Sequence, residues 1–152
     1  ALLPDPGSLG PLTKGKTDYG KLWAMLNSDL FQEDDVPFIG LEHTQGVGRF
    51  GASTNHSLGW NNGFLHGCVM SQSRPYELVK PQAWQKVAWS PSDYVFKVQK
   101  NEVKKKDPKP TSEKAAIRLF PNIDFAPGKL ENNHDGLMDA ALIAYYAKRV
   151  SL

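Results

Sequence analysis

The pattern of apolar and polar positions is clearest near the end of the chain. From Asp135 to Arg149, alanine, leucine, isoleucine and tyrosine recur at helical spacing, which predicts one long helix with a buried face. A second pattern predicts a helix from about Asn55 to Met70. Its small residues Gly59, Gly63 and Gly67 recur every four positions, which favours tight packing of this helix on a sheet.

Two short apolar runs predict buried strands. The first spans residues 36–42 and ends on the Glu42 carboxylate. The second spans residues 75–80 and leads into a helix that begins at Pro81, a residue suited to a first helical turn. A carboxylate that is buried at the end of an apolar strand needs a partner. The alternative is that the strand ends in solvent and the Glu42 carboxylate is exposed. Strands that alternate with helices indicate an α/β layer fold.

Two further regions are interpreted from their residue types. Thr17 and Asp18 open a helix whose apolar stripe begins at Tyr19. Residues 90–110 combine three prolines with a run of lysines, which predicts a basic excursion on the surface. A helix that starts at Ser112 is expected to follow it.

Composition bounds the class of protein. The 152 residues are 40% hydrophobic and 22% charged, which is typical of one globular domain. No apolar run approaches the ~20 residues that span a bilayer, and the chain lacks a basic and apolar secretory leader. The single cysteine, Cys68, excludes an internal disulfide and indicates a reducing compartment. The four histidines show no ligand spacing with Cys68, which argues against zinc.

The net charge of +2 is too small to indicate a class of binding partner, but the charges are distributed unevenly along the chain. Seven lysines and one arginine lie between Lys97 and Arg118, against three acids, Glu102, Asp107 and Glu113. This stretch is either a solvated charged face or a surface for an anionic backbone.

Asp135 and Asp139 are the most informative polar residues. Being four apart, they lie one turn apart on the same side of a helix, where like charges repel. A divalent cation between them would reverse the sign of that interaction. The alternative is helix capping, because acids are favoured at the positive end of the helix dipole. With Glu42, the two aspartates form an oxygen-rich set that suits Mg²⁺ or Mn²⁺, and paired ions of this kind promote phosphodiester hydrolysis.

Taken in their order along the chain, several motifs resemble those of the RuvC-type Holliday junction resolvases, in particular the branch that contains the plant chloroplast and phage resolvases. The resemblance covers about residues 17–149. It is carried by Leu41-Glu42, by the glycine-rich loop and glycine-ridged helix that follow, by the Val-Lys-Pro-Gln-Ala-Trp-Gln-Lys segment at residues 79–86, by residues 114–121, and by residues 135–145.

The resemblance implies a ribonuclease H-like fold, with helices around a mixed central β-sheet, in one nuclease domain over residues 1–152. It implies a Mg²⁺- or Mn²⁺-dependent crossover junction endodeoxyribonuclease with two metal ions per site. Such an enzyme acts on four-way DNA junctions in recombination and repair as a homodimer, and needs neither a membrane nor a small-molecule cofactor. Glu42, Asp135 and Asp139 match three of the four metal-binding acids. The expected location is the bacterial or phage-infected cytoplasm, or an organelle nucleoid.

The fourth acid is expected on the first strand, where the sequence departs from the pattern. Asp5-Pro6-Gly7 imitates the expected turn, but too few residues precede it to form a central strand. We therefore expect residues 1–3 to be the end of the second strand, with the first strand and its aspartate missing and Asp5 in a loop.

Basic and aromatic residues supply the candidate nucleic-acid contacts. They are Arg49, Phe50, Lys80, Lys86, Lys104, Lys105, Lys106, Lys109 and Lys114. The helix at residues 55–70 is the candidate dimer interface, through Leu58, Phe64, Leu65 and Val69. Two other functions are compatible with the sequence: a ribonuclease H-like nuclease for flaps or RNA–DNA hybrids, and a non-catalytic junction-binding protein.

Overall fold

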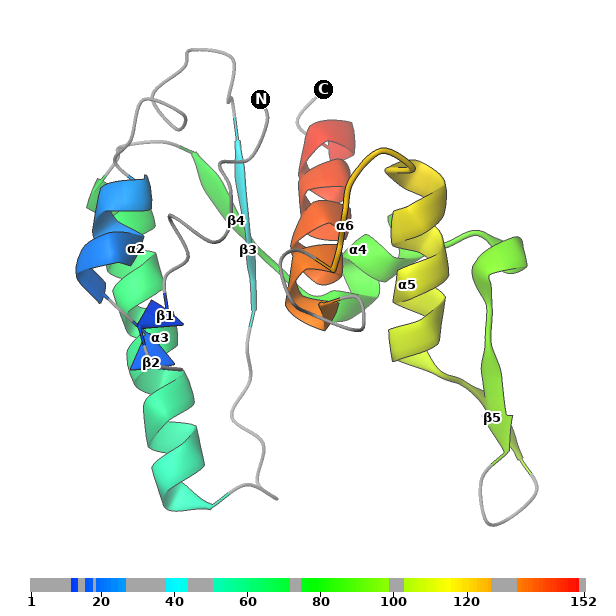
Figure 1. Ribbon diagram of the computed structural model, residues 1–152, viewed down its shortest axis with the longest axis horizontal. Helices are drawn as coiled ribbons and strands as arrows, with labels where there is room; N and C mark the ends of the chain where they lie inside the picture. Colours follow the sequence, from blue (N-terminus) through cyan, green and yellow to red (C-terminus); the bar gives the residue numbers. More distant parts are fainter. Residues whose placement is uncertain are drawn as a thin grey trace. The chain divides into compact units, whose positions relative to one another are not determined.

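The computed structural model of the protein describes residues 12–13, 16–17, 19–26, 38–43, 51–71, 75–98, 103–126 and 134–150 (Figure 1). The chain divides into two compact units, Ala1–Leu78 and Val79–Leu152. Each unit has its own helices and strands.

In the first unit, a short helix lies along a long one. Its elements are β1 (Leu12–Thr13), β2 (Lys16–Thr17), α2 (Tyr19–Leu26), β3 (Ile39–Glu42), α3 (Ala52–Ser71) and β4 (Tyr76–Val79), the last ending at the first residue of the second unit. β1 and β2 pair antiparallel, and β3 pairs with β4 in a second two-stranded sheet. The Tyr19 hydroxyl donates to Asn61 Oδ1 at 2.6 Å, and the Tyr19 ring packs edge-on against Phe64, which fixes α2 against α3.

In the second unit, α6 packs against both α4 and α5 (Figure 1). The elements are α4 (Pro81–Ala88), the 3₁₀ turn η2 (Pro91–Asp93), β5 (Phe96–Val98), β6 (Lys104–Lys106), α5 (Pro108–Leu119) and α6 (Asp135–Val150). The buried core of this unit comes mostly from these three helices. It consists of Val79, Trp84, Ala88, Ala115, Ala116, Phe125, Met138, Leu142, Ile143 and Tyr146.

The spacing of apolar residues explains this packing. On α6 the buried residues Met138, Leu142 and Tyr146 recur every four positions and form one face. The side of α5 that is buried carries small side chains, including Ala115 and Ala116, so the two helices can approach closely. Burial of these faces, rather than helix propensity alone, stabilises the three helices.

Several predicted elements are confirmed. α6 has the expected bounds to within one residue, and α4 begins at Pro81 as predicted. α3 begins at Ala52, three residues before the predicted start. β3 and β4 lie within the two predicted strands, although residues 36–37 are outside the described residues. Thr17 is the last residue of β2, α2 begins at Tyr19, and Asp18 between them lies outside the described residues.

The predicted basic excursion at residues 90–110 has more regular structure than expected. β5 and β6 pair in an antiparallel hairpin, and α5 begins at Pro108 instead of Ser112. Pro108 and Pro110 lie in the first turn of α5, where backbone N–H groups have no partner within the helix, so proline costs no hydrogen bond there. The predicted helix start at Ser112 is therefore four residues too late.

The predicted packing of the glycine ridge is also wrong for the described part of the chain. A Cβ atom added at Gly59, Gly63 or Gly67 would meet no described atom within 4 Å. Because no described atom approaches the ridge that closely, no tight contact with the described residues requires these glycines.

The described residues form a mixed α/β structure, which confirms the predicted fold class. Their strands pair only in two-stranded sheets. The larger central sheet of a ribonuclease H-like fold and the single domain over residues 1–152 stay predictions. Within the described ranges, no helix has both the length and the apolar character needed to cross a membrane.

Candidate active site

The two aspartates of the final helix lie where the sequence predicts them. Asp135 is the first residue of α6, and Asp139 follows one turn later. Asp135 is at the exposed helix start, with 51% of its side chain accessible. Asp139 is half-buried because it borders the buried face, directly after Met138. α6 therefore holds an exposed and a half-buried carboxylate one turn apart.

The surroundings of Asp139 disfavour its negative charge. Burial raises the pKa of the Asp139 carboxyl above its ordinary value, and the nearby charge of Asp135 raises it further. Ser112 on α5 partly offsets this, because its hydroxyl donates a hydrogen bond to the carboxylate. A cation beside Asp139 would relieve both unfavourable effects.

Lys109 supplies one positive charge to this pair. It comes from the first turn of α5, and its Nζ atom donates to Asp135 Oδ2 at 2.6 Å. The hydrogen bond and charge of Asp135 raise the pKa of the Lys109 ammonium, and Asp139 adds a smaller effect in the same direction. Because the Lys109 side chain is 77% exposed, the ammonium could move aside for another cation.

Glu42, the third predicted acid, ends β3 in the first unit and is half-buried, so its predicted place at a strand end is confirmed. Within the described residues, no three histidine, cysteine, aspartate or glutamate side chains gather closely enough to hold a metal ion. The second unit contributes two of the predicted metal ligands, the carboxylates of Asp135 and Asp139. Carboxylate oxygens are the donors that Mg²⁺ and Mn²⁺ prefer. The chemistry of this donor pair fits either ion, and the role of Glu42 as a third ligand stays a prediction.

The predicted nucleic-acid contacts are solvent-accessible wherever the structure describes them. Lys80, Lys86, Lys104, Lys105, Lys106, Lys109 and Lys114 are all exposed. Arg49, Phe50 and Asp5 lie outside the described residues, so their predicted roles stay predictions. Lys109 also contacts a predicted metal ligand, Asp135.

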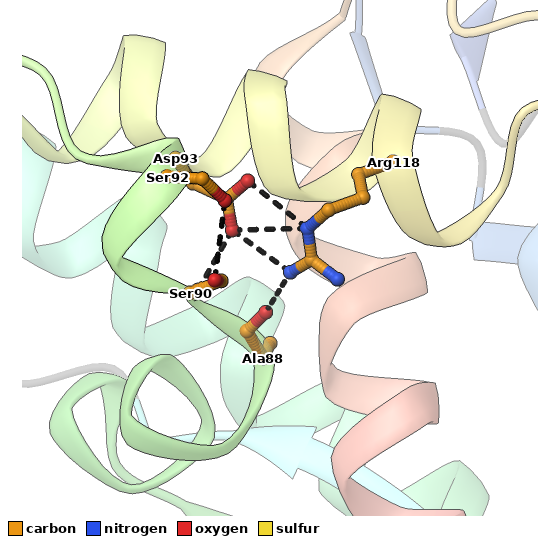
Figure 2. Close-up of polar contacts among 5 residues, drawn as sticks. All are labelled: Ala88, Ser90, Ser92, Asp93 and Arg118. Carbon is orange, nitrogen blue, oxygen red and sulfur yellow. Dashed lines mark hydrogen bonds and ion pairs between the residues drawn. The ribbon is translucent and has the colours of Figure 1, made fainter.

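Sequence reasoning missed the ion pair between Asp93 and Arg118, which Figure 2 shows. Asp93 is only 3% exposed and receives two hydrogen bonds from Arg118 Nε, at 3.0 and 3.2 Å, and one from its Nη2, at 2.8 Å. The same Nη2 atom donates to the Ala88 carbonyl at 2.8 Å. Asp93 also accepts from the Ser90 backbone N–H at 2.7 Å. The pair thus joins the end of α4, η2 and α5.

Arg118 lowers the pKa of Asp93, mainly through these hydrogen bonds. The sequence carried one usable local signal, because Ser90 and Asp93 have the spacing of a capping box and form one. The partner Arg118 lies 25 residues away and has no such signal. We assign this pair a structural role.

The second unit also has an open hollow of about 550 Å³, lined by Phe120, Ala144, Tyr145, Lys148 and Arg149. It lies near the end of α6, whereas Asp135 and Asp139 are in its first two turns. The ten residues from Asp139 to Arg149 correspond to roughly 15 Å of helix. The hollow and the acid pair are therefore separate features.

No family model, curated protein or solved structure matches the chain in the three comparisons with known proteins.

Proposed function

We propose that this protein is a metal-dependent endonuclease that cuts four-way DNA junctions, on a ribonuclease H-like scaffold. The observation that carries the proposal is the acid pair of α6. Asp135 and Asp139 stand one turn apart although their charges repel, and burial adds to the cost of the Asp139 charge. An arrangement that is unfavourable for the isolated chain is expected where a bound cation compensates it. The resemblance to RuvC-type resolvases supports the choice of reaction and substrate.

Asp135, Asp139 and Glu42 would hold the metal ions in this proposal. A divalent ion of this kind activates water and stabilises the leaving oxygen of a phosphodiester. The chain's own residues set the geometry. The Ser112 hydroxyl orients the Asp139 carboxylate, while Lys109 balances the charge of Asp135 until a cation or a phosphate approaches.

The test compares a mobile four-way junction with a linear duplex of matched sequence, each incubated with Mg²⁺ and with a chelator. Cleavage of the junction alone, and only with Mg²⁺, supports the proposal. Equal cleavage of a flap or an RNA–DNA hybrid would favour a related nuclease of different selectivity. If the chain binds the junction but cleaves it under none of these conditions, the result would favour a non-catalytic junction-binding protein.

Assembly gives a further prediction. A junction with two-fold symmetry calls for two active sites related by a two-fold axis, so we expect a homodimer. Of the predicted interface residues on α3, Leu58 is 40% exposed, and Phe64 and Leu65 are half-buried. Val69, also predicted at the interface, contributes no apolar area because it is only 3% exposed. Sedimentation at micromolar concentration should give twice the monomer mass, and a strict monomer that nicks both strands in concert would contradict the dimer.

The lysines of β6 give a prediction on salt dependence. Neutralising Lys104, Lys105 and Lys106 together should flatten the decrease of junction affinity with salt. Each lost phosphate contact changes the slope of log affinity against log salt by about 0.9 on duplex DNA. Titrations between about 50 and 200 mM salt measure this slope. An unchanged slope would show that this run is only a solvated face.

A further inference from the structure

The β5–β6 hairpin carries a surface that the acid pair does not explain. It extends beyond the three helices of the second unit (Figure 1). All residues of its two strands are exposed. In the antiparallel register, the opposite pairs are Phe96 with Lys106, Lys97 with Lys105, and Val98 with Lys104.

This register gives the hairpin two chemically different faces. Residues directly opposite each other share a face, and successive residues along a strand alternate between faces. One face, which we call the mixed face, therefore carries Phe96, Val98, Lys104 and Lys106. The other face carries Lys97 and Lys105, and Lys97 pairs with Asp107 at 3.2 Å.

The mixed face combines exposed apolar area with positive charge. Phe96 is 53% exposed and Val98 is 66% exposed. Lys106 Nζ lies 3.5 Å from the centroid of the Tyr94 ring, and that ring meets Phe96 edge to face at 6.3 Å. The structure thus orders an aromatic pair and an ammonium group on one side of the hairpin.

The charge of the mixed face favours an anionic partner. Among the described residues, neither of its two strand lysines forms an ion pair, and the described acid of the hairpin, Asp107, pairs with Lys97 on the other face. A polyanion with flat apolar groups would use both the lysines and the exposed ring. Nucleic acid has this chemistry, but a duplex hides its base faces in the stack. Only unpaired nucleotides can offer a base to Phe96 and phosphates to the lysines at once.

We propose that the mixed face of the β5–β6 hairpin binds unpaired nucleotides of a DNA strand, with Phe96 stacking on a base and Lys104 and Lys106 contacting phosphates. This deepens the proposed function, on which the choice of DNA rests, by naming the part of the substrate that this surface holds. Unpaired nucleotides occur where strands branch.

The test measures binding by the whole chain in a chelator, so that no cleavage occurs. The probes are a fluorescein-labelled thymidine oligonucleotide of about 15 nucleotides and a duplex of the same length, followed by anisotropy. The wild type should bind the single strand more tightly. Phe96→Ala should weaken this binding roughly fivefold or more, since each stacked base contributes measurably to affinity. Phe96→Leu, which keeps apolar area without a ring, should weaken it to a similar extent.

Matched lysine variants test the assignment of faces. Lys104→Ala on the mixed face should reduce the salt slope by about 0.7, the value for one phosphate contact on a single strand. Lys97→Ala, a lysine on the other face whose charge is paired with Asp107, should leave the slope unchanged. Helical circular dichroism and Tm confirm that each variant is folded, as expected for substitutions at exposed positions.

Four results would overturn the proposal: duplex binding as tight as single-strand binding, Phe96→Ala with wild-type affinity, Phe96→Leu with wild-type affinity, or equal effects of Lys104→Ala and Lys97→Ala. The proposed nuclease activity can fail separately. If the chain binds the single strand through Phe96 but cuts no junction, the proposed role of the hairpin is supported and the proposed endonuclease activity is contradicted.

Discussion

Asp139→Asn should abolish junction cleavage while leaving junction binding intact or tighter. The substitution removes a proposed metal ligand, so we expect the cleavage rate of the complete protein to fall by at least about a hundredfold. It also removes a negative charge that repels phosphate. Single-turnover cleavage and binding in chelator, measured with the same labelled junction, separate these two effects.

The same variant should be more stable than the wild type at neutral pH. The pKa of Asp139 is raised in the folded protein, so its charged form opposes folding, and stability falls as pH rises from the unfolded pKa through the folded one. Asparagine avoids that cost and keeps an acceptor for Ser112. At pH 7 without metal we expect a gain of only about 0.5 kcal/mol, because solvent screens the charge of this half-buried carboxylate. No gain is expected below about pH 4, where the wild-type carboxyl is protonated.

Asp124→Asn is the matched control for this prediction. Asp124 is an exposed carboxylate of the same unit, and its Oδ1 accepts a hydrogen bond from the Ala126 backbone, which asparagine can also accept. Neither cleavage nor stability should change appreciably. If Asp139→Asn retained Mg²⁺-dependent cleavage at a rate near that of the control, Asp139 would be only part of the helix start.

Arg118→Met should cause the largest loss of stability among the substitutions considered. It leaves the Asp93 carboxylate, which is 3% exposed, without its charge partner. Stranding a fully buried charge costs about 3–5 kcal/mol. Because the Arg118 side chain is 40% exposed and solvent screens part of the pair, we expect about 2–3 kcal/mol, or a fall in Tm of roughly 5–10 °C.

The pH dependence gives this prediction a second readout. The pKa of Asp93 is lowered in the folded protein, so the pair stabilises the wild type above the ordinary aspartate pKa near 3.9 and is lost as pH falls through the folded value. In Arg118→Met, burial favours the protonated acid instead. The stability deficit of the variant should therefore shrink as pH falls toward 4.

Arg149→Met serves as its control, because it removes an exposed arginine of the same unit. Arg149 contacts the Tyr145 ring and donates to the Tyr145 hydroxyl at 2.9 Å, without a buried acid to strand. It should cost less than about 1 kcal/mol. Equal Tm values for the two variants would show that the Asp93–Arg118 pair does not stabilise this unit.

Local patterns in the sequence were sufficient for the parts of the structure that depend on local spacing. α6 was predictable because its apolar residues repeat over four turns, and the same spacing placed Asp135 and Asp139 on one side. The Pro-Gln-x-Trp-x-Lys segment has a structural explanation as well. Pro81 starts α4, and Trp84 is 1% exposed in the core.

Features built from distant residues could not be predicted in this way. β5 and β6 are short, and three consecutive lysines have little strand propensity of their own. Long-range bonds beside the hairpin help to hold it: the Val95 N–H donates to Thr111 Oγ1, and the Asp107 N–H donates to the Val95 carbonyl at 2.7 Å. Lys109 and Asp135 are also far apart in the sequence, by 26 residues, so no local sequence motif could predict their contact.

The most direct test of the central claim is a Mn²⁺ titration of the whole chain, followed by the loss of the free-ion signal in electron paramagnetic resonance. The wild type should bind Mn²⁺, Mg²⁺ should displace it, and Asp139→Asn should weaken binding at least about tenfold, while Asp124→Asn leaves it unchanged. Equal Mn²⁺ affinity of the wild type and Asp139→Asn would contradict the assignment of the acid pair as a metal site.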